Sequence, residues 1–330
     1  MNRRLLAAVG AVALVLGATA GIKVIRAGTP ADGKHYGHVF VIMMENTGYR
    51  SLIGNPNAPW INRAVATYGV ATSYYGVAHP SQPNYIAATS GLTGDHSNAD
   101  QTLDVPNIVD QLESRGKTWK AYMQSYALCG GNASATACGN ELYVRKHNPF
   151  ISYANVQRDP MRVAKIVDLH ELEADLARGE VADYNWISPD QCHNMHGRGP
   201  ASDACSFSHA SKLIAAGDAF LGSWVGKIMA SRAWQGNPVI FITWDESDVS
   251  TTGSGGFPDT RGCCGASPGG GHVLTIVISR STHTARRSPV AYNHYALLRT
   301  IQDGWQLGCL GFTCDTANVP AMSDLVGPQG

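Results

Sequence analysis

The sequence has no excess charge of either sign, since 25 lysines and arginines balance 25 aspartates and glutamates. It contains no basic cluster or stripe, which is the usual electrostatic footprint of a nucleic-acid-binding protein. It also lacks internal repeats, long linkers and the Cys-x-x-Cys pairs that hold structural zinc. These absences argue against a nucleic-acid partner, a repeat protein and a cysteine-ligated zinc site.

The one apolar run near the N-terminus is short for a membrane span. Arg3 and Arg4 precede the apolar residues 5–16, and Ala18-Thr-Ala20 has the small residues of a cleavage site. We therefore expect a signal peptide over 1–20, a linker over 21–35 and a single folded domain over 36–330. The protein would be secreted or held in the cell envelope, with no stable membrane span after cleavage. An uncleaved N-terminal anchor is the alternative.

Eight cysteines, all beyond residue 20, agree with export to an oxidising compartment. Three pairs are close in sequence and predict local disulfides: Cys129 with Cys138, Cys192 with Cys205, and Cys309 with Cys314. The adjacent Cys263 and Cys264 could bridge each other or cross over, because sequence does not fix connectivity.

Buried-type strands alternate with amphipathic stretches along most of the chain. The runs 38–44, 238–244 and 272–279 are almost wholly apolar, as is typical of strands buried on both faces. Helical patterns of apolar residues cover 59–68, 105–115, 169–178, 208–234 and 292–303. The sequence therefore predicts an α/β protein, a three-layer α/β/α sandwich around a mainly parallel sheet.

Two of the apolar runs end directly in polar pairs, Glu45-Asn46 and Asp245-Glu246. Ligands bind outside the carboxyl ends of the strands in open α/β sheets, so we expect the two pairs to meet at one rim. Their oxygen atoms would suit one divalent cation, with Mg, Ca or Mn favoured. For either pair alone, a surface charge or a helix cap is the simpler alternative.

The stretch His79-Pro-Ser-Gln-Pro-Asn-Tyr85 lies between a predicted strand and a predicted helix. Pro83 suits the first turn of that helix, which places Ser81 at its mouth. Free backbone N–H groups there favour an anion, so Ser81 could attack phosphorus or help to hold a phosphate. The alternative is that Ser81 only caps the helix, a common role for serine.

Several histidines lie in loops near the expected rim, where they could bind phosphate or protonate a leaving group. The candidates for leaving-group protonation are His196 and His272, and the candidates for substrate binding are His79, Asn84, His193 and Asn194. The remaining histidines, including His96 and His147, are read as structural or surface residues.

Five motifs occur in an order that resembles the bacterial phosphoesterase family of secreted acid phosphatases and phosphatidylcholine-type phospholipases C, within the alkaline phosphatase superfamily. They are Val41-Ile-Met-Met-Glu-Asn46, His79-Pro-Ser-Gln-Pro-Asn-Tyr85, Ser188-Pro-Asp190 through His196-Gly197, Trp244-Asp-Glu246 and Gly270-Gly-His272. The resemblance implies an alkaline phosphatase-like catalytic domain in which Ser81 is the nucleophile that becomes phosphorylated. It also implies metal ligation by Glu45, Asn46, Ser81, Asp245 and Glu246. Two-metal relatives carry histidine at the positions of Asn194 and Glu246, so these departures favour one metal ion.

The resemblance thus implies a secreted, metal-dependent phosphoric-ester hydrolase, most simply an acid phosphatase acting on phosphomonoesters. A phospholipase C-type phosphodiesterase is the alternative, and the substrate would be a small phosphate ester or a phospholipid headgroup. A conventional serine hydrolase is disfavoured, because the Gly-x-Ser-x-Gly elbow is absent around Ser81. A non-catalytic secreted phosphate- or metal-binding protein is the more distant alternative.

Overall fold

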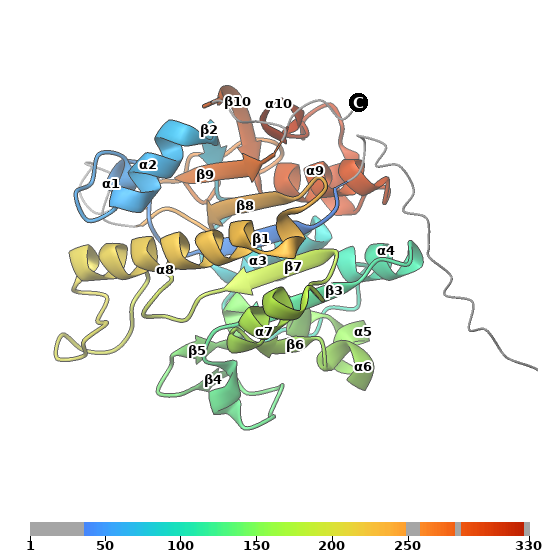
Figure 1. The fold of residues 1–330 in the computed structure, drawn as a ribbon, viewed down its shortest axis with the longest axis horizontal. Helices are drawn as coiled ribbons and strands as arrows, with labels where there is room; N and C mark the ends of the chain where they lie inside the picture. The colour runs from blue at the N-terminus through green and yellow to red at the C-terminus, as the bar shows by residue number, and fades with distance from the viewer. Residues whose placement is uncertain (1–35, 249–257, 281–284, 327–330) are drawn as a thin grey trace, which may run out of the picture. The chain divides into compact units, whose positions relative to one another are not determined.

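A computed structural model describes residues 36–248, 258–280 and 285–326. It shows an eight-stranded sheet with helices on both faces (Figure 1). The strands of this sheet are β1 (Val39–Met44), β2 (Gly69–Tyr75), β3 (Trp119–Met123), β6 (Ile166–Asp168), β7 (Tyr184–Ser188), β8 (Val239–Trp244), β9 (His272–Ser279) and β10 (Arg287–Asn293). A separate two-stranded sheet pairs β4 (Ala137–Cys138) with β5 (Tyr143–Val144). The predicted signal peptide and linker lie outside the described residues.

The strand order is β10-β2-β9-β8-β1-β7-β3-β6. Within this sheet β9 pairs antiparallel with both β2 and β8, and the other pairings are parallel. The predicted α/β fold with a mainly parallel sheet is therefore confirmed. All residues of β1 and β8 are buried at the centre, as their unbroken apolar sequences require.

The helices cover the sheet in two groups. The α-helices are α1 (Tyr49–Leu52), α2 (Pro59–Thr67), α3 (Gln82–Ser90), α4 (Ile108–Ser114), α5 (Ala154–Gln157), α6 (Pro160–Val163), α7 (His170–Arg178), α8 (Ala210–Ala230), α9 (His294–Trp305) and α10 (Ser323–Val326). The short 3-10 helices are η1 (Tyr126–Cys129), η2 (Arg145–His147), η3 (Phe150–Ser152), η4 (Arg232–Trp234) and η5 (Gly311–Cys314). Both α2 and α7 pack against α8, whereas α3 packs against α9.

The long helix α8 runs unbroken through Gly217 and Gly222. Side chains of Met195 and Trp60 come so close to Gly217 and Gly222 that a Cβ atom would meet them at 2.6 and 3.0 Å. Of the described helices, α8 is long and apolar enough to cross a membrane by length and composition. In this structure, however, Asp218 of α8 is buried and accepts hydrogen bonds from the first backbone N–H groups of α2, so one face of α8 packs against the rest of the domain.

Four disulfides link the eight cysteines. They join Cys129 to Cys138, Cys192 to Cys205, Cys263 to Cys264, and Cys309 to Cys314. The three local pairings predicted from spacing are confirmed, and the adjacent cysteines bridge each other.

The carboxyl ends of β1, β8 and β2 lie at one edge of the sheet. Because β1 and β8 are parallel neighbours with Met44 opposite Trp244, the pairs that follow them leave the sheet at the same level. Strand β2 runs in the same direction, since the antiparallel β9 lies between β2 and β8. The chain after β2 leads into α3, and Ser81 therefore reaches the edge where the two polar pairs emerge.

Candidate active site

Ser81 points its hydroxyl into the cluster of strand-end carboxylates. Its Oγ lies 3.1 Å from Glu45 Oε2 and 3.1 Å from Glu246 Oε1, and the residue is 1% exposed. It precedes the first residue of α3, but its side chain makes no capping hydrogen bond. The alternative that Ser81 only caps the helix is therefore wrong, because its oxygen contacts carboxylates and no backbone N–H group of the first turn.

Asn84 organises the turn that carries His79 and Ser81. Its Oδ1 accepts the backbone N–H groups of Val77 and Ala78 at 2.7 and 3.1 Å, and its Nδ2 donates to the carbonyl oxygen of Ala78 at 2.8 Å. Asn84 is also fully buried. With its amide occupied in this way, Asn84 positions the turn, and its predicted contact with substrate stays a prediction.

The first turn of α3 offers less backbone to an anion than the sequence suggested. The N–H of Gln82 donates to Asn98 Oδ1 at 3.0 Å, Pro83 has no N–H, and the N–H of Asn84 donates to the carbonyl oxygen of Ser81 at 2.9 Å. The positive end of the helix dipole still favours an anion there. Direct hydrogen bonds to a phosphate must nevertheless come mainly from side chains.

Glu45 is fully buried and has polar partners on both carboxylate oxygens. Tyr85 Oη donates to Oε1 at 2.6 Å and His147 Nε2 lies 3.1 Å from it, while Asn46 Nδ2 and Ser81 Oγ approach Oε2. Burial alone would raise the pKa of Glu45, but His147 outweighs it and holds the pKa well below its usual range. Glu45 is thus a carboxylate at neutral pH, ready to bind a cation or accept a proton.

Glu246 joins Ser81 to His79. One carboxylate oxygen faces the Ser81 hydroxyl, and the other is in contact with His79 Nδ1. His79 Nε2 lies 3.0 Å from the carbonyl oxygen of Asp259, which can only accept a hydrogen bond. Burial alone would lower the pKa of His79, but the hydrogen bond and the charge of Glu246 raise it above the usual value. Both ring nitrogens of His79 thus face oxygen atoms, which favours the protonated imidazole two residues before Ser81.

Asp245 has a buried oxygen with no hydrogen-bond partner. Its Oδ1 accepts the backbone N–H of Asn46 at 2.9 Å, whereas Oδ2 has none, and the residue is fully buried. Burial, and then the charges of Glu45 and Glu246, raise the pKa of Asp245 well above its usual value. A carboxylate oxygen left in this way is costly unless a cation approaches it.

The donors at this edge fit a hard divalent cation by chemistry. Three buried carboxylates, an amide oxygen and a hydroxyl are the ligand types that Mg, Ca and Mn prefer. Across the described residues, no three His, Cys, Asp or Glu side chains are already arranged as a closed metal cage. Asn46 and Ser81 would therefore have to complete the ligand set.

The structure brings His196 and Asn194 to the site. Asn194 accepts the backbone N–H of Glu45 at 2.9 Å through its carbonyl oxygen, and its Oδ1 accepts the N–H of His196 at 2.8 Å. The ring of His196 lies 6.3 Å from that of His147, which contacts Glu45. Asn194 thus holds both Glu45 and His196 in place, which is a positioning role.

His193 and His272 are engaged elsewhere. His193 Nδ1 pairs with Asp190 at 2.7 Å, and its ring lies beside that of Phe220 on α8. His272 stacks on Tyr49 with ring centroids 4.5 Å apart, and its Nε2 lies 2.9 Å from the carbonyl oxygen of Thr72. Their predicted contacts with substrate stay predictions.

Sequence reasoning missed two partners of Glu45, namely His147 and Tyr85. Tyr85 follows Ser81 by four residues, so helical spacing alone could have placed it on the same side of α3. His147 arrives from η2, about a hundred residues beyond Glu45, and stacks on Tyr85 with ring centroids 5.2 Å apart. No motif surrounds His147, and its position depends on the tertiary fold.

Comparison with known proteins gives family matches over most of the chain. The Phosphoesterase family matches residues 55–308. A probable acid phosphatase from Kluyveromyces lactis is 25% identical over 299 residues, which cover 87% of this chain and 62% of that protein. An acid phosphatase from Aspergillus fumigatus is 25% identical over 85% of this chain and 57% of its own length. The chain thus spans about three fifths of these two relatives. A phosphatidylinositol-3-phosphatase from Mycobacterium tuberculosis is 25% identical over 88% of this chain and 83% of its own length.

Solved structures share the fold at low sequence identity. An alkaline phosphatase superfamily protein from Vibrio parahaemolyticus has a TM-score of 0.55 and 14% identity over 83% of this chain and 67% of that chain. The lipoteichoic acid synthase LtaP from Listeria monocytogenes has a TM-score of 0.53 and 11% identity over 91% of this chain and 76% of its own. These neighbours place the sheet and its helices among alkaline phosphatase-like folds.

Proposed function

This chain belongs to the Phosphoesterase family, and from that premise we propose that it hydrolyses phosphoric esters with Ser81 as nucleophile. The observation that carries the proposal is the Ser81 hydroxyl, which lies between the carboxylates of Glu45 and Glu246 instead of capping α3. An acid phosphatase acting on phosphomonoesters is the form that the names of the relatives support. A phospholipase C-type phosphodiesterase is the alternative.

We assign the binding of one divalent metal ion to Glu45, Asn46, Asp245 and Glu246, together with Ser81 Oγ. The partnerless Oδ2 of Asp245 supports this assignment, because a buried carboxylate oxygen needs a donor or a cation. When bound, such an ion lowers the pKa of the serine hydroxyl and holds a phosphoryl oxygen.

In the proposed reaction, Ser81 Oγ forms a bond to phosphorus in line with the ester oxygen that leaves. Its proton passes to Glu45 or Glu246, the two carboxylates it already contacts. Water then attacks the phosphoserine, which releases phosphate and restores the hydroxyl. Two in-line displacements give net retention at phosphorus.

We assign protonation of the leaving oxygen to His196. Its Nδ1 lies 2.7 Å from the carbonyl oxygen of Gly197, which can only accept, so Nδ1 carries a proton and Nε2 is the nitrogen left to face the leaving oxygen. His272 is less suited, because its Nε2 is engaged by the carbonyl oxygen of Thr72. Histidines are protonated below neutral pH and bind phosphate best in that form, which agrees with an acid optimum of activity.

We further propose that the protein works outside the cytoplasm on a small phosphate ester or a phospholipid headgroup. Four disulfides support an oxidising compartment, because such bonds are rare in reducing ones. The relative from Mycobacterium tuberculosis that is named for a phosphoinositide supports the lipid headgroup.

The nucleophile is tested by Ser81→Ala beside a matched control, Ser90→Ala. Ser90 is equally buried at the other end of α3, where its Oγ donates to the carbonyl oxygen of Ile86 at 3.0 Å. We expect Ser81→Ala to lower kcat about a thousandfold or more, as removal of a nucleophile does, and Ser90→Ala to leave kcat nearly unchanged. The assay compares 4-nitrophenyl phosphate with 4-nitrophenyl phosphocholine across pH, with and without a chelator.

The preferred ester decides between phosphatase and phospholipase C, and loss of turnover in chelator supports the metal. Undiminished turnover by Ser81→Ala would sink the assignment of the nucleophile. Tight phosphate binding without turnover of either ester by metal-loaded protein would favour the binding-protein alternative.

The role of His196 is tested by leaving groups of different acidity. A proton donor matters most for a poor leaving group, so His196→Gln should slow hydrolysis of an alkyl phosphate about a hundredfold. Hydrolysis of 4-nitrophenyl phosphate should change much less. Equal losses for both esters would assign His196 to positioning instead.

A further inference from the structure

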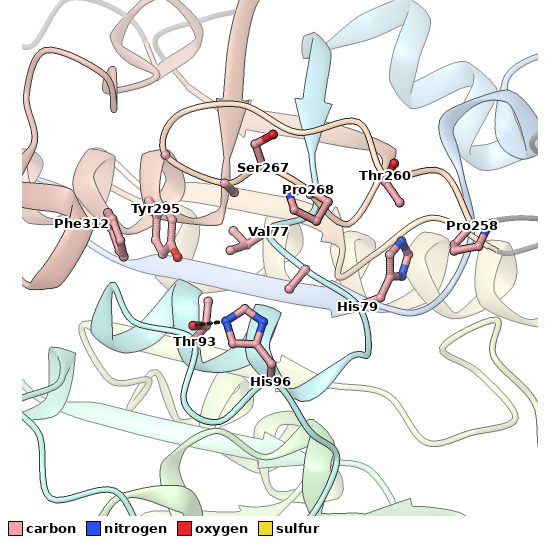
Figure 2. Close-up of a pocket in the computed structure, with 14 residues that line it drawn as sticks. Val77, His79, Thr93, His96, Pro258, Thr260, Ser267, Pro268, Tyr295 and Phe312 are labelled. Atoms are coloured by element: carbon pink, nitrogen blue, oxygen red, sulfur yellow. Dashed lines mark hydrogen bonds between the residues drawn. The ribbon is translucent and has the colours of Figure 1, made fainter.

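A cavity of about 490 Å³ opens at His79, two residues before the proposed nucleophile (Figure 2). Its walls come from the turn before α3, the segment around Thr93 and His96, the loop 265–269, and α9 with η5. Figure 2 shows His79 at one end of the cavity and the rings of Tyr295 and Phe312 together at the other. Cavities of this volume hold small molecules in other proteins.

The carboxylate of Glu246 links Ser81 to the cavity. His79 lines it and contacts one oxygen of Glu246, whose other oxygen lies 3.1 Å from Ser81 Oγ. A phosphoryl group at Ser81 would therefore have the His79 end of the cavity next to it.

Helix α3 connects the proposed nucleophile to the aromatic end of the cavity. Ser81 precedes its first residue, and Gly91 ends it in the left-handed conformation. The carbonyl oxygen of Gly91 accepts the N–H of Phe312 at 2.9 Å, so the aromatic wall is attached to the far end of the helix that carries the nucleophile. Nine helical residues rise about 14 Å, which is the approximate distance that a bound group must cover to reach Phe312.

The aromatic end is rigid and partly open. Phe312 belongs to η5, which the Cys309–Cys314 disulfide closes, and its ring stacks on Tyr295 with centroids 5.1 Å apart. Tyr295 is buried, whereas Phe312 is 44% exposed, so one aromatic face is available at little cost in ordering. Stacking on such a face favours a ring over a flexible polar chain.

The described lining of the cavity contains no Asp, Glu, Lys or Arg side chain. It consists of apolar residues, two aromatic rings, hydroxyls and the histidines His79 and His96, with His96 held by Thr93 at 2.8 Å. Apart from His79 at the end nearest the phosphoryl group, a second phosphate or a carboxylate on the bound group would meet no fixed counter-charge there. An uncharged group would lose little on entering.

We propose that this cavity receives the leaving group of the substrate and selects phosphomonoesters of long, uncharged, ring-bearing alcohols. The inference rests on the proposed function for the position of the phosphoryl group. It goes further by naming the chemical class of the ester and the residues that recognise it. A single ring attached to the ester oxygen fills the part near His79, and a second ring in line with it reaches toward Tyr295 and Phe312.

The test compares phenyl phosphate with biphenyl-4-yl phosphate, whose phenols are similar in acidity. Wild-type kcat/KM should be about tenfold higher for the biphenylyl ester, the value of one well-placed aromatic contact. Phe312→Ala should remove this preference by slowing the biphenylyl ester alone. The control is Phe207→Ala, an aromatic residue that is 62% exposed and lies outside the cavity lining, and it should change neither ester.

Failure of this inference is distinguishable from failure of the proposed function. Ser81-dependent hydrolysis of both esters at equal kcat/KM, unaffected by Phe312→Ala, would overturn the leaving-group site and leave the nucleophile intact. If neither ester is hydrolysed, calorimetric titration of the Ser81→Ala protein with the two esters still decides. Tighter binding of the biphenylyl ester that depends on Phe312 supports the site, and equal affinities overturn it.

Discussion

Replacing Asp245 by asparagine should stabilise the metal-free protein while abolishing its response to divalent cations. Asparagine keeps the oxygen that accepts the backbone N–H of Asn46 and is almost the same size. It removes one of three carboxylates that are buried at the same edge of the sheet. Most substitutions of buried residues destabilise a protein, so an increase in stability would be diagnostic.

The geometry around Ser81 gives the scale of the repulsion between two carboxylates at this edge of the sheet. Glu45 Oε2 and Glu246 Oε1 both lie 3.1 Å from Ser81 Oγ, so they are at most about 6 Å apart. Two unit charges at that distance repel by about 3 kcal/mol at an effective dielectric constant near 20. The same two carboxylates act on Asp245, whose pKa is raised by burial and then by their charges. Because a raised pKa favours the protonated form, part of the repulsion on Asp245 is already relieved by a proton. We therefore expect Asp245→Asn to add about 1–3 kcal/mol to the free energy of unfolding in chelator.

Urea unfolding in chelator and then in Mg, Mn or Ca measures both halves of the prediction. A cation at a hundred times its Kd should stabilise wild type by about 2.7 kcal/mol and should leave Asp245→Asn nearly unchanged. The matched control is Asp175→Asn on α7. Asp175 is also buried, but it is paired with Lys120 at 2.6 Å and accepts from Tyr122 at 2.8 Å. The same substitution should therefore destabilise there, by about 2 kcal/mol, and should leave the cation response intact.

Two results would refute this reasoning. If Asp245→Asn destabilises the protein in chelator as Asp175→Asn does, the three carboxylates do not repel one another appreciably. If Asp245→Asn keeps the full cation response, Asp245 is not a ligand and its partnerless oxygen needs another explanation.

Three further substitutions test the scaffold. Asp218→Ala leaves the N–H groups of Trp60 and Ile61 without an acceptor and should cost about 2–3 kcal/mol in urea unfolding; a loss below about 0.5 kcal/mol would contradict this. Gly91→Ala places a side chain at φ +74° with its Cβ 2.2 Å from the carbonyl oxygen of Leu310, so the unfolding free energy should fall by about 2 kcal/mol or more. For Glu113, burial alone would raise the pKa, but hydrogen bonds from Lys165, Trp119 and Arg162 lower it to about 2. Its contribution to stability is thus present above the unfolded pKa and lost as pH falls through the folded pKa. The Tm deficit of Glu113→Gln should be largest near pH 7 and shrink toward pH 2; a deficit that does not change with pH would contradict it.

The sheet and the edge that bears the site could be predicted from sequence because their signals are local. Unbroken apolar runs followed at once by Glu45 and Asp245 mark strand ends, and parallel neighbours bring such ends together. The observed register, with Met44 opposite Trp244, confirms that step. Strand β10 escaped prediction because its sequence, Arg287–Asn293, is mostly exposed and contains a proline. Periodicity carries little information about such an edge strand.

The partners of the carboxylates could not be predicted, since they arrive from loops whose paths depend on the whole fold. His147 reaches Glu45 from η2, and the loop containing Asp259 supplies the carbonyl oxygen that holds His79. A histidine in such a loop has no periodic pattern to mark it. The sequence therefore indicated which carboxylates gather, but not which imidazoles contact them.

The first turn of α3 shows how a motif can mislead about chemistry. The motif around Ser81 predicts a nucleophile above a helix N-terminus rich in free N–H groups, yet Asn98 occupies the N–H of Gln82 and Pro83 supplies none. Stabilisation of a phosphoryl group then falls to side-chain cations and any bound metal ion. His79, whose pKa Glu246 raises, is the basic side chain nearest to Ser81 in sequence among the contacts of the site. Replacing His79 by a neutral residue should therefore weaken transition-state binding more than the loss of any one backbone N–H donor of α3 would. The motif alone predicts the opposite order.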